Sequence, residues 1–427
     1  MNKNKQLRCC LRWPLYITTM ALIGCEPSEE LQPIDQGPCG EVWGDIPASG
    51  RLYVDETVDD DGDGTLATPF SSLDEALAGA RETGIRSIAI APGEYPGHYE
   101  LANRDAWLDS GLEISGCGRD ETQLTGIVLE DENSPLDDGL PQPVIRISDS
   151  STANIVVRDL GIRDGRRAVL ITGGAGATGP IRLERLDIVD SLRIGVLVDG
   201  ATTVAELVDV HVDGVQSEGD AFGWGIAIQT GMQFSGEIPA PTRLQSVTVT
   251  GAQGLGVLAD GAWIEIEDSS VQGVSSLDGF LGRGVQLQQW TKGTLLGLES
   301  IDNSDAAVFL ESPGRNGEAI HVLDSRLGPT TAAALPDTPG ETAADGLVAT
   351  QITSTPYPSS NFLVVLDDTE LQGNPRAHVL ADGITIEVGA DNVWGKGTDF
   401  PLVSQGAAAV SGLEGGELEQ PVEQLDE

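Results

Sequence analysis

The chain has 427 residues, of which 40% are hydrophobic and 4% aromatic, and it contains 54 glycines. A core of Val, Ile, Leu and Ala with frequent glycine turns is typical of many short strands rather than of packed helices. With 24 basic and 67 acidic residues the formal net charge is −43, and such a surface excludes nucleic acid as a partner because it repels polyanions.

The first 25 residues predict export. Four positive residues precede the apolar run Trp13–Ile23, which is too short to span a bilayer. The run ends in LIGC at Cys25, which resembles the lipobox of bacterial lipoproteins. The resemblance implies that residues 1–24 are a signal peptide and that Cys25 carries a lipid. The alternative is an ordinary secretory signal with an incidental cysteine.

This resemblance also implies a location. A lipid on Cys25 would hold the protein, which we expect to be a monomer, on a membrane of the bacterial cell envelope. The next residue is Glu26 rather than the Asp that retains many such lipoproteins on the inner membrane. We therefore expect the outer membrane.

Residues 25–50 are rich in Pro, Gly and Glu, which predicts a tether between the lipid and the body. Cys9 and Cys10 would leave with the signal peptide, so Cys39 and Cys117 remain in an oxidising compartment. A disulfide between them is one expectation, and two free or buried thiols are the other.

The body begins at residue 51, with a cap and first coil expected over residues 51–104. An alternating strand leads to an Asp-rich loop and then to a short helix, in which Ser72 and Glu75 fit a capping box and Gly84 ends the helix. A strand with Ile88 and Ile90 inward follows. This series, over Tyr53–Tyr95, resembles the N-terminal cap of pectin-lyase-like, right-handed parallel β-helix proteins. In that family the helix covers the open end of the first coil.

A repeat along residues 105–405 supports the same fold. A small residue followed by alternating apolar positions recurs at intervals of 23–31 residues, with one interval of 39, and a second alternating strand accompanies each. The long interval holds an insertion, Gly328–Asp345, expected as a surface loop. We predict an all-β solenoid with a short capping helix, followed by an acidic tail at 406–427. The repeats begin at Ala168, Gly195, Gly225, Gly256, Gly284, Ala307, Gly346 and Ala377.

The Asp-rich loop raises the question of calcium. Asp59, Asp61, Asp63 and Gly64 match the first half of an EF-hand loop, but Phe70 stands where a bidentate Glu is needed, and a strand precedes the loop. An EF-hand is therefore excluded. A looser calcium site remains one alternative, and a polar loop before the capping helix is the other.

Arginines cluster in one window of the solenoid, and the window has two interpretations. Lyases of the pectin-lyase-like fold use an Arg or Lys as base, and this resemblance implies Arg158, Arg163 and Arg185 as catalytic candidates or as a strip that holds an acidic glycan. Aligning neighbouring repeats instead places Arg158 beside Glu184 and Asp159 beside Arg185, which predicts ion pairs between coils. The seven arginines are Arg158, Arg163, Arg166, Arg167, Arg182, Arg185 and Arg193.

Three classes of function fit the sequence. The preferred one is a non-catalytic lipoprotein whose solenoid face binds a polysaccharide or another envelope partner. The alternative is a polysaccharide lyase, epimerase or hydrolase with a divergent, calcium-assisted site around Arg158–Arg193, although the family's catalytic motifs are mostly missing. The third is a structural spacer. Exposed aromatic side chains on one face would favour a neutral glycan, and the tryptophans to inspect are Trp224, Trp263, Trp290 and Trp394.

Overall fold

The structure is a computed structural model of the whole chain, which divides into residues 1–35 and residues 36–427. Everything described below belongs to the second unit. The described residues are 39, 50–58, 62–102, 107–126, 142–148, 154–173, 180–200, 203–218, 223–230, 238, 240–277, 281–312, 318–331, 333–334, 342–351, 363–389, 391–395, 400–405, 408–411 and 423–425.

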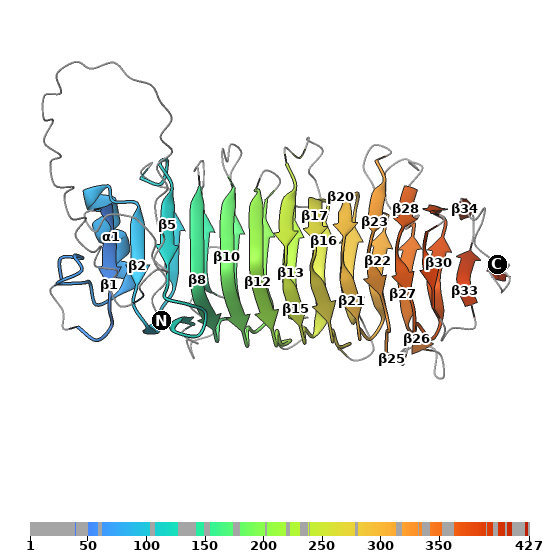
Figure 1. The fold of residues 1–427 in the computed structure, drawn as a ribbon, viewed down its shortest axis with the longest axis horizontal. Helices are drawn as coiled ribbons and strands as arrows, with labels where there is room; N and C mark the ends of the chain where they lie inside the picture. The colour runs from blue at the N-terminus through green and yellow to red at the C-terminus, as the bar shows by residue number, and fades with distance from the viewer. Residues whose placement is uncertain are drawn as a thin grey trace, which may run out of the picture. The chain divides into compact units, whose positions relative to one another are not determined.

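The helix α1 (Leu73–Thr83) packs against the first strands, β1 (Leu52–Val54) and β2 (Ser87–Ile90) (Figure 1). Its predicted caps are present. The Ser72 hydroxyl accepts a hydrogen bond from the Glu75 backbone N–H, and Gly84 adopts the left-handed conformation that ends the helix. The buried face of α1 joins the main core, so the helix covers the beginning of the solenoid as expected.

Parallel pairing builds two ladders, which form one sheet of 21 strands, here called sheet A. They are joined because three long strands, β8 (Ile155–Arg163), β10 (Ile181–Val189) and β12 (Ala205–Asp213), run through both. Besides these and β1 and β2, the first ladder contains β5 (Leu112–Ser115), β14 (Thr242–Gln245), β17 (Trp263–Glu267), β20 (Lys292–Leu296), β23 (Ile320–Leu323), β28 (Leu363–Asp367), β31 (Thr385–Val388) and β34 (Ala409–Ser411). The second contains β3 (Gly93–Pro96), β6 (Thr122–Thr125), β15 (Thr248–Thr250), β18 (Ser270–Gln272), β21 (Glu299–Ile301), β24 (Arg326–Leu327), β29 (Glu370–Leu371) and β32 (Val393–Trp394).

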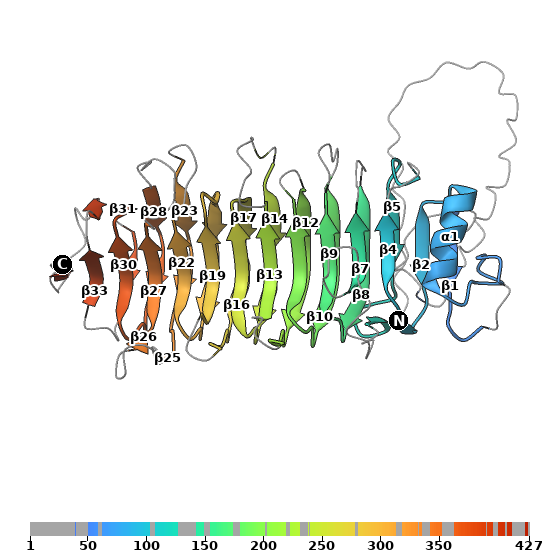
Figure 2. The ribbon, with the colours of Figure 1, turned by 180° about the vertical axis from the view of Figure 1, so that it is seen from behind.

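A third parallel ladder of 12 strands, here called sheet B, completes each coil (Figure 2). Its strands contain all eight of the repeats that the sequence predicted. They are β4 (Tyr99–Ala102), β7 (Pro143–Ser148), β9 (Arg167–Thr172), β11 (Ile194–Asp199), β13 (Gly223–Gln229), β16 (Gly254–Asp260), β19 (Arg283–Gln288), β22 (Ala306–Glu311), β27 (Asp345–Thr350), β30 (Ala377–Asp382), β33 (Phe400–Gln405) and β35 (Glu423–Leu425).

Sharp bends divide the two ladders of sheet A. At eight successive bends one residue has positive φ, and an Asp is usual there because its short polar side chain tolerates this conformation. In register, the bend column is Asp159, Arg185, Asp209, Ser246, Asp268, Gly297, Asp324 and Asp368. A second column of left-handed residues ends the strands of the second ladder and begins with Asp164 and Asp190.

One continuous core fills the space between the sheets. The small residues that open the repeats point into it, because a Cβ on Gly256 would lie 2.5 Å from the Gly284 carbonyl oxygen and 2.3 Å from the Val271 side chain. The last repeat differs from the expectation. Asp345 pairs with Ala377, so His378, not Ala377, occupies the position of the small residue. The inward stacking of Val379 on Leu347 sets this register.

Pairing extends into the segment predicted as an acidic tail. β34 pairs with β31, and β35 pairs with β33, so both sheets continue past residue 405. In the predicted surface loop at 328–345, β25 (Ala333–Ala334) and β26 (Thr342–Ala343) form a short antiparallel pair. The rigid frame that positions any site is therefore the three-ladder coil.

Candidate functional site

The structure places the arginine candidates on the outer side of sheet A. The Arg158 guanidinium lies 2.7 Å from Glu113 and 2.5 Å from Asp159, and Arg185 lies 2.6 Å from the other oxygen of Asp159. Burial lowers the pKa of Arg158, but its hydrogen bonds and ion pairs with Glu113 and Asp159 raise it by more. The net effect is a raised pKa, so the side chain stays charged. Arg163 is exposed at the end of β8.

These contacts match the arrangement that aligning the repeats predicts for Asp159 and Arg185 but not for Arg158 and Glu184. Asp159 is in register with Arg185 and binds it, and Arg158 is in register with Glu184 but is paired with Glu113 of the preceding coil instead. A guanidinium held by two carboxylates is poorly placed to act as a base.

Of the remaining arginines of the window, Arg182 also lies on sheet A, in β10, with its Nε 3.0 Å from Glu184, and the other three lie elsewhere. Arg166 and Arg193 sit at turns between the sheets, 2.8 Å and 4.0 Å from Glu218, and Arg167 is buried in β9 of sheet B. The window that is contiguous in sequence is therefore distributed over several faces of the coil. It forms no single basic strip in the described chain.

The Asp-rich loop is described only in part, since Asp59 and Asp61 lie outside the described residues. The Asp63 carboxylate accepts hydrogen bonds from the Thr68 hydroxyl and, at 3.0 Å, from the Thr65 backbone N–H. These bonds lower the pKa of Asp63 to about 2. One of its oxygens thus already stabilises the loop that leads into the capping helix. Across the described ranges, no group of three or more His, Cys, Asp or Glu side chains is arranged to bind a metal.

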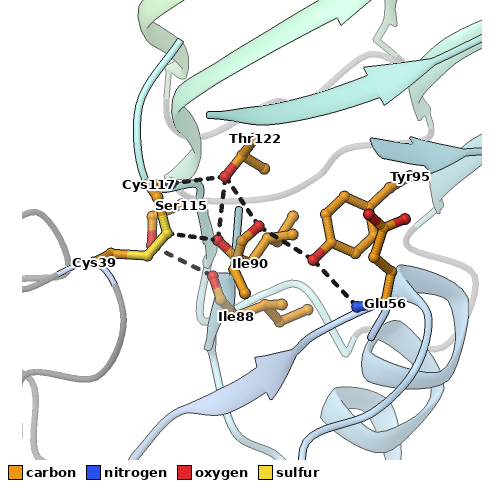
Figure 3. Close-up of a disulfide and its surroundings, with 9 residues drawn as sticks. Cys39, Glu56, Ile88, Ile90, Tyr95, Ser115, Cys117 and Thr122 are labelled. Carbon is orange, nitrogen blue, oxygen red and sulfur yellow. Dashed lines mark hydrogen bonds between the residues drawn. A yellow bond between two sulfur atoms is a disulfide. The ribbon is translucent and has the colours of Figure 1, made fainter. Parts of the chain in front are cut away.

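Cys25 lies outside the described residues, whereas Cys39 and Cys117 are joined by a disulfide with their Cα atoms 5.0 Å apart (Figure 3). In the part of the chain that the structure describes, no helix is long and apolar enough to cross a membrane.

The outer face of sheet B has a different character from that of sheet A. Along each of its strands some residues enter the main core and the others point away from it. Because neighbouring coils are in register, the outward residues form rows that run along the solenoid at about 4.8 Å per coil. Two of these rows are chemically distinctive.

One row alternates between acids and neutral hydrogen-bonding residues on consecutive coils. Its central five members, here called the acid–amide row, are all half-buried. Thr350 and then Asp382 continue the alternation, with the Thr350 hydroxyl 3.5 Å from the Asp382 carboxylate. The acid–amide row consists of Asp199, Gln229, Asp260, Gln288 and Glu311.

The acids of this row share one electrostatic property. Burial raises the pKa of Asp199, of Asp260 and of Glu311. The positive charge of Arg167 and a hydrogen bond from Gln229 oppose the rise for Asp199, and a hydrogen bond from Gln288 opposes it for Asp260. For Glu311 the positive charge of Arg283 opposes the rise, and the negative charge of Asp260 adds to it. Such perturbed carboxyl groups are concentrated at functional sites, although ion-pair networks also produce them.

Polar side chains of β19 connect this row, at the end of the strand, to Arg283 at its beginning. Gln288 accepts a hydrogen bond from Gln286 at 2.5 Å, and Gln286 accepts one from Arg283 at 2.9 Å. Arg283 also lies 2.7 Å from Asp305, and its guanidinium carbon sits 3.4 Å from the centroid of the Phe309 ring. The network fixes the orientation of both glutamines.

The neighbouring coils carry an apolar strip on the same outer face. Trp224 packs against it, half-buried, and its indole N–H has no hydrogen-bond partner among the described residues. The strip consists of Leu170, Ile194, Leu197, Ala227, Leu255 and Leu258.

The other tryptophans that the sequence singled out lie elsewhere. Trp263 is on the outer side of sheet A, where the Lys292 ammonium sits 3.9 Å from its ring centroid. Trp290 and Trp394 pack against the main core. Of these four, only Trp224 therefore lies on the outer face of sheet B, near the start of β13, whereas the row passes through Gln229 at the end of that strand.

Sequence reasoning missed the acid–amide row, although a signal was present. The residue four positions after each small repeat residue is Asp, Gln, Asp, Gln and Glu in five consecutive repeats, beginning at Gly195. Counting from His378, the corrected position in β30, the same offset reaches Asp382.

No protein-family model matches the sequence, and a comparison with curated proteins finds no match. Solved structures do match. The chain is similar to the catalytic domain of a glycoside hydrolase family 87 α-1,3-glucanase in complex with nigerose, with a TM-score of 0.51 and 11% identity over 90% of this chain and 69% of that one. A variant of such a domain with tetrasaccharides gives 0.51 and 11% over 87% and 70%.

A weaker match is the A-module of a mannuronan C-5 epimerase from Azotobacter vinelandii, with a TM-score of 0.41 and 15% identity over 84% of this chain and 100% of that one. At these identities the likeness concerns the fold. Together with the three parallel ladders and the capping helix, the likeness to the glucanase domains shows that the chain has the right-handed parallel β-helix fold.

Proposed function

We propose that the outer face of sheet B binds a neutral glycan, and that the protein is a non-catalytic glycan-binding lipoprotein of the bacterial outer membrane, anchored through Cys25. The observation that carries the proposal is the acid–amide row, which presents a hydrogen-bonding side chain on five consecutive coils.

The chemistry of this face suits a sugar chain. Carboxylates accept hydrogen bonds and amides both donate and accept them, so the row can pair with successive hydroxyl groups. Trp224, half-buried against the buried apolar strip, offers its ring to the apolar face of a sugar, and small-molecule sites usually combine such a surface with a few fixed polar groups. The Arg283 network holds Gln286 and Gln288 in place before a ligand arrives.

The charge of the row favours a neutral glycan over a polyanion. Asp199, Asp260 and Glu311 stand on alternate coils, and a polyuronate laid along the row would place like charges beside them. The formal net charge of −43 opposes the approach of the same ligands.

The similar solved structures support the ligand class. The α-1,3-glucanase catalytic domains were solved with nigerose and with tetrasaccharides, so this fold holds neutral oligosaccharides in those proteins.

A second candidate function, glycan hydrolysis, is favoured by one observation. Asp260 and Glu311 are separated by a single intervening coil, which puts their Cα atoms about 9.6 Å apart at strand spacing. Inverting glycosidases hold two carboxyl groups roughly 6.5–9.5 Å apart, one of them with a raised pKa. Burial raises the pKa of both groups here.

One experiment tests both functions. The protein without its signal peptide is mixed with neutral and acidic polysaccharides; binding is followed by affinity electrophoresis and products by mass spectrometry. We expect a neutral glycan to be retained intact. Trp224→Ala should weaken binding about tenfold, which corresponds to ~1.4 kcal/mol. Trp263→Ala is the matched control, because Trp263 lies on sheet A, and it should leave binding unchanged.

The hydrolytic alternative has its own signature. Shortened oligosaccharides that disappear in Asp260→Asn or Glu311→Gln would establish an enzyme, since an amide keeps hydrogen-bonding capacity but cannot supply a proton or act as a base. Retention that is equally weakened by the Trp224 and Trp263 substitutions would contradict the assignment of the site to sheet B.

A further inference from the structure

The disulfide joins the segment before the first strand to the second coil. Cys39 precedes β1 by 13 residues, and Cys117 follows β5, so the bond reaches past β1 and β2 (Figure 3). The disulfide thereby closes a covalent loop that begins at Cys39, passes through β1 and β2 and ends at Cys117.

Cys117 is held firmly by its surroundings. Its backbone N–H donates to the Thr122 hydroxyl at 2.9 Å, and that hydroxyl lies 3.1 Å from the Ala91 carbonyl oxygen at the end of β2. Ser115 reaches the Ile88 carbonyl oxygen from the same side (Figure 3). Cys117 is therefore a rigid attachment point on the first two coils.

Besides forming the disulfide, Cys39 makes nonpolar contacts with the body. It contacts a small buried cluster of Tyr53, Ala89 and Cys117 on the outer side of β1 and β2, together with Leu66. Tyr53 and Ala89 are 5% and 0% exposed, so this patch is well covered. Both the covalent bond and the packing fix residue 39 in place.

We propose that the Cys39–Cys117 disulfide is a strap that makes the chain leave the body at Cys39 instead of Arg51, and so sets how far the body can stand from the membrane. This role rests on the proposed lipid at Cys25. Cys39 follows Cys25 by 14 residues, which span at most about 50 Å, whereas the 26 residues to Arg51 would span about 90 Å. The strap thus removes nearly half of the available reach.

The test uses two matched insertions in the full-length lipidated protein. A flexible Gly/Ser segment of about twelve residues is inserted either after Asp35, before the strap, or after Gly44, inside the closed loop. Both variants keep the disulfide and the folded body. A donor fluorophore at exposed Glu82 of α1 reports energy transfer to acceptor lipids in vesicles.

Under non-reducing conditions only the insertion after Asp35 should lower the transfer. After reduction, or in a Cys39→Ser background, both insertions should lower it alike. Equal loss for both insertions with the disulfide intact would overturn the strap. If the wild-type protein lacks diacylglycerol on Cys25 and does not associate with vesicles, the lipid anchor is refuted, and with it the limit that the strap sets on the distance from the membrane. A non-reducing peptide map would then still report whether the disulfide is present.

Discussion

Arg185 occupies a position that the other coils give to Asp, Ser or Gly. It has φ of 51° and stacks between Asp159 and Asp209 in the bend column. A long side chain with positive φ is strained, so a compensating interaction is needed. The guanidinium supplies it by placing a positive charge between the two aspartates, which stand two coils apart, and its hydrogen bond to Asp159 raises the pKa of Arg185.

Replacing Arg185 should therefore reveal an electrostatic effect beyond backbone preference. Arg185→Asn introduces a residue that accepts positive φ but leaves the nearly buried Asp159 with only one arginine, and we expect a loss of about 1–2 kcal/mol in the free energy of unfolding. Arg243→Gln is the matched control, because Arg243 bridges Glu206 and Glu265 on a more exposed surface. There we expect less than about 1 kcal/mol.

Urea unfolding followed by circular dichroism measures both changes. An Arg185→Asn variant as stable as the wild type would show that the bend column needs no charge compensation.

His378 is the second residue with an unusual position. It is completely buried where other coils have Gly or Ala, with Nδ1 3.1 Å from the Asn374 amide nitrogen and Nε2 3.0 Å from the Gly395 carbonyl oxygen. Nδ1 thus accepts from Asn374 and Nε2–H donates to Gly395, a pairing that requires the neutral ring. Burial lowers the pKa of His378, and the bond to Gly395 only partly opposes this.

This geometry predicts a pH dependence of stability. In the unfolded chain the ring has its ordinary pKa near 6.5, so below that pH the unfolded state binds a proton that the folded state does not. The contribution of His378 is therefore complete above about pH 6.5 and is lost as the pH falls toward the folded pKa, by at most about 1.4 kcal/mol per pH unit. Unfolding curves between pH 5 and 8 should show this slope. His378→Gln should abolish it, and His211→Gln, on the exposed side of sheet A, should not.

At the scale of elements, the repeated strands were the strongest sequence signal. A small residue followed by alternating apolar positions predicted eight strands of sheet B, and capping residues predicted α1. The register of β30 was not predictable in the same way. Ala377 looks like the expected small residue, but the inward stacking of Val379 decides the pairing and puts His378 in its place.

The small residues themselves can be tested. A methyl group on Gly256 would meet the Gly284 carbonyl oxygen and the Val271 side chain, both at 2.5 Å or less, so neighbouring coils would have to separate. We expect Gly256→Ala to lower the free energy of unfolding by about 1–3 kcal/mol. Differential scanning calorimetry measures this, and an unchanged melting temperature would contradict the close contact.

The candidate site was harder to predict from the sequence than the strands were. The arginine window is contiguous along the chain, but the coil distributes Arg158, Arg166 and Arg167 over different faces. The acid–amide row is the opposite case, because its members are 23–31 residues apart in the sequence and can be recognised as neighbours only when the strand register is known. Acidic residues are frequent in this chain, so their offset within each repeat was the only available signal.

At the scale of the whole molecule, charge and architecture point to the same ligand class. The repeated coil presents equivalent side chains at regular spacing, which suits a polymer with a regular repeat. The net charge of −43 disfavours anionic polymers and has little effect on neutral ones. Binding of a neutral glycan to sheet B should therefore change little with salt, since no long-range charge attraction is involved.

The most direct measurement is a crystal structure of the protein with a retained neutral oligosaccharide. We predict density for the sugar across the outer face of β13, β16 and β19, with hydrogen bonds to Gln229, Asp260 and Gln288 at the ends of these strands and a ring against Trp224 near the start of β13. Density on sheet A, or an oligosaccharide that leaves the outer face of sheet B empty, would contradict the account.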